Sequence, residues 1–261
     1  MKRKKLFFTA AVLLFAASLP LAAQETAEAI VRSSRNRISA ATVSSRSQMT
    51  ISARDGRTTA RRLDQYSKDG PKGSRTVVIF IDPPSVRNTR FLTVETGNGA
   101  SDQWIFMPDA GKVRRIAASG GGESFVGTDL SYDDVSSADR DPALDTHTLL
   151  REENLNGKPC YVVESKPLDG SYQYSKMVQW IGRQDKVAYK LELYDRKGNH
   201  AKTLEILELK NVQGRLSPVK TRMSTLAAGT NTLITVERLE YDSNIPDSVF
   251  TTSFLETGKP K

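Results

Sequence analysis

The chain has 261 residues, a formal net charge of +8 and a single cysteine. One cysteine excludes an intramolecular disulfide, so an exported form of the chain must be held by its hydrophobic core. Neither of the two histidines, His147 and His200, has a metal-ligand partner two or four residues further along the chain, which argues against a histidine metal centre.

Residues 1–23 have the pattern of a secretory signal peptide. Basic residues from Lys2 to Lys5 precede an apolar run from Leu6 to Leu21, and small residues follow up to Ala23. We expect cleavage after Ala23, which leaves a single domain at residues 24–261. An uncleaved anchor is the alternative, but the run is short of the ~20 residues that a spanning helix needs. Removal lowers the net charge from +8 to about +4, and export argues against a nucleic-acid partner.

The rest of the chain predicts a mainly β (α+β) fold. A helix is expected over residues 24–38, where Ala27, Ile30 and Val31 fall near helical spacing. From Ser44 onward the apolar period is two, and turn signals such as Asn156-Gly157 recur. The expected strands are residues 44–52, 58–66, 75–81, 89–95, 104–107, 112–116, 146–154, 158–166, 174–181, 186–194, 200–211, 217–226 and 231–240. They predict one curled antiparallel sheet.

Two of these runs, residues 77–81 and 104–107, are apolar at every position. A strand that is apolar on both sides is covered on both faces, so both runs are expected in the middle of the sheet. The available covers are the N-terminal helix and residues 120–138.

Two stretches carry a family resemblance. Trp104-Ile-Phe-Met-Pro-Asp-Ala-Gly-Lys-Val-Arg-Arg-Ile and Phe125-Val-Gly-Thr-Asp-Leu-Ser-Tyr-Asp-Asp resemble the periplasmic LolA-like family of outer-membrane lipoprotein-sorting proteins, and Ile245-Pro-Asp-Ser-Val-Phe-Thr resembles its last element. The resemblance implies an open half-barrel, covered by an N-terminal helix and a short helical lid, that holds acyl chains. Lipid or lipoprotein acyl chains, an inner-membrane export complex and an outer-membrane acceptor are the implied partners.

The candidate binding residues come from apolar strand positions that can face a cavity. They are Val77, Ile79, Ile81, Phe91, Trp104, Phe106, Tyr189, Leu191 and Leu193. Arg114 and Arg115 are adjacent in one strand and point to opposite faces. Either they form salt bridges with Asp129 or Asp133, or one of them closes a lid by bonding this acidic segment.

Catalytic chemistry is not indicated. No nucleophile–base pair is evident, Cys160 is expected to be a buried apolar side chain, and Gly120-Gly121-Gly122 lacks the ending of a phosphate loop and reads as a hinge. An acidic cluster does not match the spacing of a calcium loop and is interpreted as capping or lid contacts. Its members are Asp129, Asp133, Asp134, Asp139, Asp141 and Asp145.

We therefore expect no enzyme activity, no cofactor and no metal. The sequence favours a monomeric periplasmic carrier of acyl chains or lipoproteins. An envelope scaffold or sensor that binds a protein partner on the same fold is the main alternative, and a hydrolase of envelope lipids ranks below it.

Overall fold

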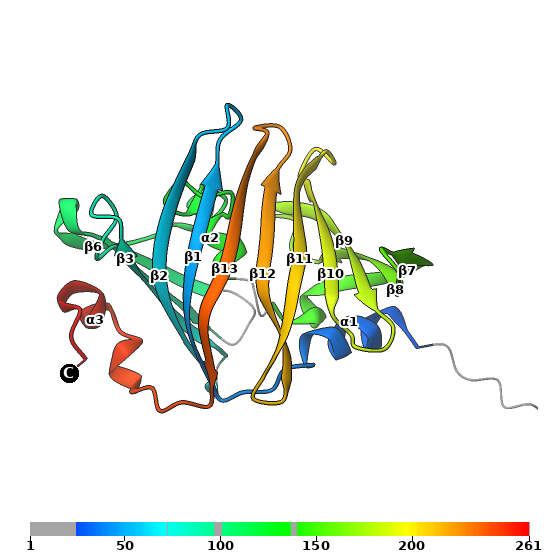
Figure 1. Cartoon of the computed structure of the whole chain (residues 1–261), viewed down its shortest axis with the longest axis horizontal. Helices are drawn as coiled ribbons and strands as arrows, with labels where there is room; N and C mark the ends of the chain where they lie inside the picture. Colours follow the sequence, from blue (N-terminus) through cyan, green and yellow to red (C-terminus); the bar gives the residue numbers. More distant parts are fainter. Residues whose placement is uncertain (1–24, 72, 97–100, 137–139, 261) are drawn as a thin grey trace, which may run out of the picture.

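The computed structural model describes residues 25–71, 73–96, 101–136 and 140–260 (Figure 1). The expected signal peptide and Asp139 lie outside the described residues. None of the described helices is both long and apolar enough to cross a membrane.

In the described residues, thirteen antiparallel strands form one sheet, as the period-two pattern predicts. The sheet does not close, as the family resemblance implies. The order is β6-β5-β4-β3-β2-β1-β13-β12-β11-β10-β9-β8-β7. The strands are β1 Thr42–Ser52, β2 Thr58–Lys68, β3 Arg75–Asp82, β4 Arg90–Glu95, β5 Ser101–Met107, β6 Lys112–Arg115, β7 Asp145–Leu155, β8 Lys158–Pro167, β9 Tyr174–Gly182, β10 Ala188–Asp195, β11 His200–Val212, β12 Arg215–Thr225 and β13 Thr230–Tyr241.

The chain path follows from this order. The chain enters the sheet in its middle at β1, runs outward to one edge at β6, and reappears at the opposite edge at β7. It then returns strand by strand to β13, beside β1. Residues 116–144, which we call the crossing segment, therefore connect the two edges of the sheet. They contain the short helix α2 (Tyr132–Ser136).

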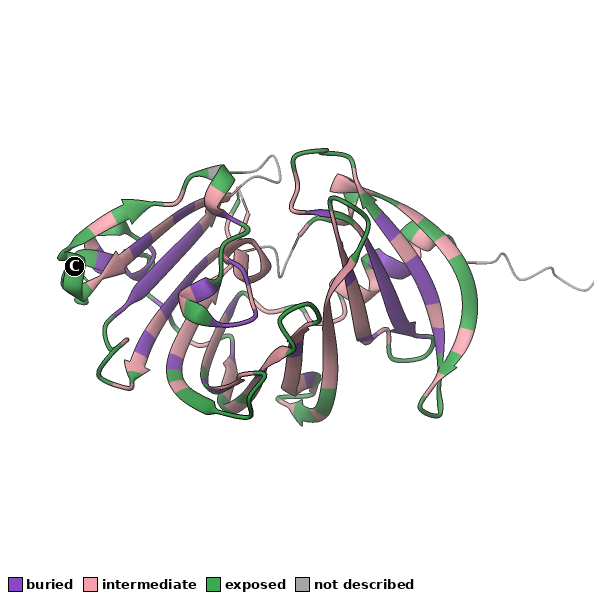
Figure 2. Cartoon of the chain, turned by 90° about the horizontal axis from the view of Figure 1, so that it is seen from above, coloured by how far each residue is buried: buried purple, intermediate pink, exposed green. Residues whose placement is uncertain are grey.

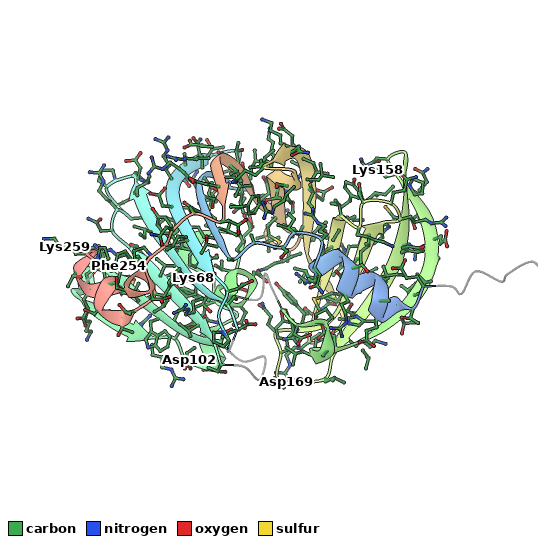
Figure 3. All side chains as sticks on the ribbon, turned by 90° about the horizontal axis from the view of Figure 1, so that it is seen from below. Lys68, Asp102, Lys158, Asp169, Phe254 and Lys259 are labelled. Atoms are coloured by element: carbon green, nitrogen blue, oxygen red, sulfur yellow. The ribbon has the colours of Figure 1, made fainter. Side chains whose placement is uncertain are left out.

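The sheet curves into an arc with a concave and a convex face (Figure 2). Val78, Phe91 and Ile105 are paired across β3, β4 and β5 and share the concave face, whereas Val77 and Leu92 are paired on the convex face. The helix α1 and the crossing segment lie inside the arc, and α3 lies outside it (Figure 3).

Helix α1 (Ala27–Arg35) begins where the side chain of Thr26 accepts a hydrogen bond from the backbone N–H of Ala29. Its buried residues Ile30 and Val31 pack against Val163 and Ile181. The helix therefore covers the β7–β9 end of the concave face. It does not cover residues 77–81, so that sequence-based expectation is wrong.

Helix α3 (Thr252–Thr257) covers the convex face at the other end of the sheet. Phe254 and Leu255 are buried against Val77 and Leu92, and the guanidinium of Arg90 donates to the carbonyl oxygen of Leu255 at 2.6 Å. With the crossing segment on the concave side, this helix explains why the strands here are apolar on both faces. The mid-sheet position expected for residues 104–107 is wrong: β5 is second from an edge.

The convex face of β8 and β9 is covered by charged side chains of the neighbouring strands β7 and β10. Trp180 is 5 % exposed, and the ammonium of Lys190 lies 4.2 Å from its ring centroid. Its indole N–H donates to Glu153 at 2.9 Å. Long basic side chains can cover apolar surface while their heads stay in water. Cys160 is fully buried in the same cluster, as expected.

Candidate binding site on the concave face of the sheet

The crossing segment places an aromatic side chain deep in the arc. Phe125 is 1 % exposed, and its ring centroid lies 5.6 Å from that of Phe80, 5.2 Å from that of Phe91 and 5.5 Å from that of Tyr132. These spacings suit edge-to-face and offset aromatic contacts. The first concave cluster, as we call it, consists of Met49, Leu63, Val78, Phe80, Phe91, Ile105 and Phe125.

A second concave cluster lies on the other limb of the arc and consists of Tyr174, Met177, Leu193 and Met223. Leu191 and Leu204 pack against it. Leu130 of the crossing segment contacts both clusters. One peptide segment therefore bridges the apolar surfaces of the two limbs.

Asp129 anchors the crossing segment to β13. It is 6 % exposed, and its carboxylate accepts hydrogen bonds from the hydroxyls of Thr230 and Thr232. The backbone N–H of Asp129 donates to the hydroxyl oxygen of Thr232 at 2.9 Å. Buried polar groups are nearly always hydrogen-bonded. The bonds of Asp129 to Thr230 and Thr232 therefore fix the crossing segment at this point of the sheet.

Asp134 anchors the segment to β9 and β11. Its carboxylate accepts a hydrogen bond from the hydroxyl of Tyr174 at 2.8 Å and forms an ion pair with Lys202 at 2.8 Å. The two side chains of the ion pair are 6 % and 15 % exposed. Burial and the neighbouring carboxylate raise the pKa of Tyr174 far above its usual value, so its hydroxyl remains a donor at any physiological pH.

Asp133 completes the anchoring at β5. Its carboxylate accepts a hydrogen bond from the side-chain amide of Gln103 at 3.0 Å. Burial, the largest cause, raises the pKa of this carboxyl, and the bond from Gln103 opposes the shift. Gly121 lies so close that an added Cβ would come within 2.2 Å of an Asp133 carboxylate oxygen. A side chain at this position of the expected hinge would therefore displace the Asp133 carboxylate.

The backbone above the first concave cluster adopts an unusual conformation. Val126 has φ 49° and ψ 39°, and Gly127 has φ 74°. A left-handed conformation is uncommon for a β-branched residue, and residues held there cost of the order of 1–3 kcal/mol. The crossing segment is therefore held in place against local backbone strain.

A small cavity opens between the crossing segment and the upper ends of β3 to β5. Its volume is about 180 Å³, and its lining mixes apolar side chains, such as Ile105, Met107 and Val126, with polar ones, such as Arg87 and Asp109. This volume is close to the ~150 Å³ that holds a molecule the size of benzene, so a whole acyl chain requires the crossing segment to move.

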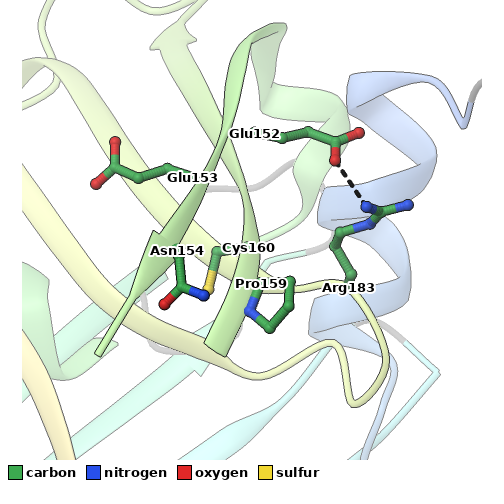
Figure 4. A pocket seen from close by; sticks show the side chains of 6 residues that line it. All are labelled: Glu152, Glu153, Asn154, Pro159, Cys160 and Arg183. Carbon is green, nitrogen blue, oxygen red and sulfur yellow. Dashed lines mark ion pairs between the residues drawn. The ribbon is translucent and has the colours of Figure 1, made fainter. Parts of the chain in front are cut away.

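A second cavity, of about 230 Å³, lies at the β7–β8 hairpin, away from the crossing segment (Figure 4). An ion pair between Glu152 and Arg183 at 2.8 Å borders it, and Cys160 belongs to its lining. Burial raises the pKa of the Cys160 thiol, so the nucleophilic thiolate is disfavoured there.

Comparison with known proteins identifies a family for the chain and solved structures that resemble it. A family model described as "Uncharacterized protein" matches residues 72–257. The chain belongs to this family. A search of curated proteins gives no match. A DUF1329 family protein from Desulfovibrio piger is 27 % identical in sequence and has a TM-score of 0.83, covering 88 % of this chain and 97 % of its own.

Two further crystal structures show that the fold is LolA-like. A putative outer membrane lipoprotein-sorting protein domain from Vibrio parahaemolyticus has a TM-score of 0.83 at 24 % identity, covering 88 % of this chain and 98 % of its own. A LolA superfamily protein from Nitrosomonas europaea has a TM-score of 0.72 at 22 % identity, covering 88 % and 99 %. The LolA-like fold that the resemblance implies is thereby confirmed.

The nine residues expected to line the cavity lie on both faces of the arc. Phe91, Leu191 and Leu193 belong to or pack against the concave clusters. The others lie elsewhere: Val77, Ile79, Trp104 and Phe106 pack in the cluster under α3, Tyr189 packs with Cys160, and Ile81 is half-buried at the end of β3. Their alternation in the sequence does not show which face each strand presents to the interior.

The expected lid residues have other partners. Arg115 forms an ion pair with Asp102, whereas Arg114 is exposed opposite Ile105 in the register of β5 and β6. Asp129 and Asp133 do contact the sheet, through Thr230, Thr232 and Gln103.

Several residues of this site were not anticipated from the sequence. Among them are Arg61 on β2, Lys202 on β11 and Tyr174 on β9. Phe125 and Tyr132 lie in the motif that carries the family resemblance, and their aromatic character was the available signal for a buried role. Among the described residues, no group of three or more His, Cys, Asp or Glu side chains is arranged to hold a metal.

Proposed function

We propose that this protein is a periplasmic carrier that binds lipid or lipoprotein acyl chains on the concave face of its sheet, for transfer toward the outer membrane. The observation that carries the proposal is that the crossing segment covers two apolar clusters and is attached to the sheet by a few polar contacts. A lipid tail that displaces Phe125 and Leu130 would find apolar surface beneath them. An inner-membrane export complex as donor and an outer-membrane acceptor follow from the same proposal.

The acyl chain and the crossing segment compete for the same apolar surface. An acyl chain of about sixteen carbons gains roughly 12 kcal/mol when buried, at ~0.8 kcal/mol per CH₂. Among the apolar side chains of the crossing segment, Phe125 is fully buried and contributes roughly 1.5–3 kcal/mol, whereas Val126, Leu130 and Tyr132 are half-buried and contribute less. A tail that takes their place therefore offsets much of its own gain against the loss of these contacts, which suits a carrier that must release its cargo.

A second candidate is an envelope scaffold or sensor that binds a protein partner. The observation that favours it is the small volume of the cavity beneath the crossing segment, about 180 Å³. In this case the concave face would remain permanently filled by the protein's own side chains.

Uptake of a fluorescent sixteen-carbon fatty acid by delipidated protein (residues 24–261) tests the proposal. Phe125→Ala weakens the competing segment and should raise the affinity for the probe several-fold. Phe254→Ala is the matched control, because it removes a similarly buried ring from the convex face and should leave the affinity unchanged. Absence of uptake by the folded wild type and by both variants would reject the carrier and support the scaffold.

A further inference from the structure

Arg61 occupies an unusual position on the concave face. It lies on β2 opposite Met49 in the strand register, three residues from the start of the strand at Thr58. The crossing segment passes directly over it: a Cβ added to Gly127 would lie 3.3 Å from Nη2 of Arg61. The guanidinium is thus close to the rim of the arc and beside the first concave cluster.

The guanidinium is not fully paired. Nη1 of Arg61 is buried and has no hydrogen-bond partner among the described residues. Other partly buried arginines differ, since Arg90 donates to the carbonyl oxygen of Leu255 and Arg37 to that of Leu216. Burial lowers the pKa of Arg61 and is the sole cause of its shift. Arg61 is half-buried, so its unpaired guanidinium carries part of the desolvation cost of a buried cation, and an anion that pairs with it recovers that part.

The acidic side chains of the neighbourhood have other partners. Asp129 is bonded by Thr230 and Thr232, and Asp82, at the top of the adjacent strand, forms an ion pair with Arg87 at 3.2 Å. Among the described residues, these two carboxylates are thus already paired with other groups, which leaves Arg61 open to an anion from outside the chain.

We propose that Arg61 binds the anionic head group, a phosphate or a carboxylate, of an amphiphile whose tail lies in the first concave cluster. This inference rests on the proposed carrier function and narrows its cargo to anionic amphiphiles. A guanidinium suits the role because it can donate two parallel hydrogen bonds to a carboxylate or phosphate. The position near the rim lets the head group remain close to water while the tail extends inward past Leu63 and Phe80.

Binding of three sixteen-carbon probes to delipidated protein tests the inference: a fatty acid, a lysophosphatidic acid and the neutral fatty alcohol. The wild type should bind both anionic probes at least tenfold more tightly than the alcohol. Arg61→Met should abolish this preference while leaving alcohol binding within about twofold, and Arg61→Lys should retain part of it. The control is Arg62→Gln, since Arg62 is next in the strand, points to the convex face and pairs with Glu237; its preference should be that of the wild type.

Each outcome is decisive. Equal binding of all three probes by the wild type, unchanged in Arg61→Met, would overturn the head-group assignment and leave the carrier function standing. A loss of all probes in a folded Arg61→Met variant would show a structural role and also overturn it. No binding of any probe by the wild type would overturn the carrier function itself. If inorganic phosphate alone binds in an Arg61-dependent way, the ligand is a free anion and the assignment is wrong.

Discussion

The ammonium of Lys202 on β11 lies 2.8 Å from a carboxylate oxygen of Asp134 in the crossing segment, and both side chains are largely buried. This ion pair attaches the segment to the limb of the arc opposite the first concave cluster. Since Asp134 also accepts hydrogen bonds from Tyr174 and from the backbone N–H of Ser131, its charge remains partly satisfied when Lys202 is removed.

Lys202→Met should release the crossing segment from the second limb. Removing one partner of a buried ion pair costs ~3–5 kcal/mol, and the remaining bonds to Asp134 place the expected loss near the lower end. Amide hydrogen exchange of residues 129–136 should become at least tenfold faster. The control is Lys210→Met, which breaks an exposed pair with Glu208 and should have little effect; equal exchange in both variants would contradict the attachment.

Gly121→Ala should displace the side chain of Asp133, because the new methyl group would collide with its carboxylate. We expect a loss of roughly 1–3 kcal/mol, typical of overpacking, seen as a lower midpoint in urea unfolding. Gly120→Ala is the matched control, since its Cβ would be 3.5 Å from Ile116, an ordinary contact. Two neighbouring glycines should therefore respond differently, and similar midpoints would show that the approach to Asp133 is not close.

Docking of the crossing segment should weaken as the pH rises. The pKa of Asp133 is raised in the folded protein, so its neutral form is favoured when the segment is docked. This contribution is fully present below the ordinary carboxyl pKa of ~3.9 and is lost as the pH rises through the folded value. Protease cleavage within the crossing segment should therefore be slower near pH 4 than near pH 7, after correction for protease activity with an unfolded substrate. Asp133→Asn should reduce the difference, and a variant that keeps it would assign the pH dependence to another group.

Tryptophan emission should be insensitive to an acyl chain on the concave face. The protein has two tryptophans, and Trp104 and Trp180 both lie in clusters outside the arc, under α3 and under Lys190. Brominated fatty acids quench at short range and should therefore leave the emission nearly unchanged at saturation, whereas Phe91→Trp, on the concave face, should be quenched. Strong quenching of the wild type would place the ligand on the convex side and contradict the proposed site.

The strands and hairpins were largely predictable because they depend on local pattern. Asn156 and Gly157, with φ of 51° and 84°, form the turn between β7 and β8 that their sequence indicates. The helix α1 was also predicted, although it begins later and ends earlier than expected.

The face of each strand was not predictable. Val77 and Val78 are both apolar, yet they contact different covering elements, α3 and the crossing segment. Alternation identifies two faces and does not say which one is concave, because this depends on the strand order of the whole sheet. The pairing of Asp134 with Lys202, 68 residues away, and the position of Arg61 under Gly127 depend on the same long-range order.

Each of the helices α1 and α3 packs on the half of the sheet that is built by the other half of the chain. Helix α1 comes from the half of the chain that builds β1 to β6 but packs on β7, β8 and β9, whereas α3 follows β13 and packs on β4, β5 and β6. Each half of the chain thus supplies a helix that covers strands of the other half. During synthesis the outer surface around Leu92 stays bare until Phe254 and Leu255 have emerged, which delays completion of the core.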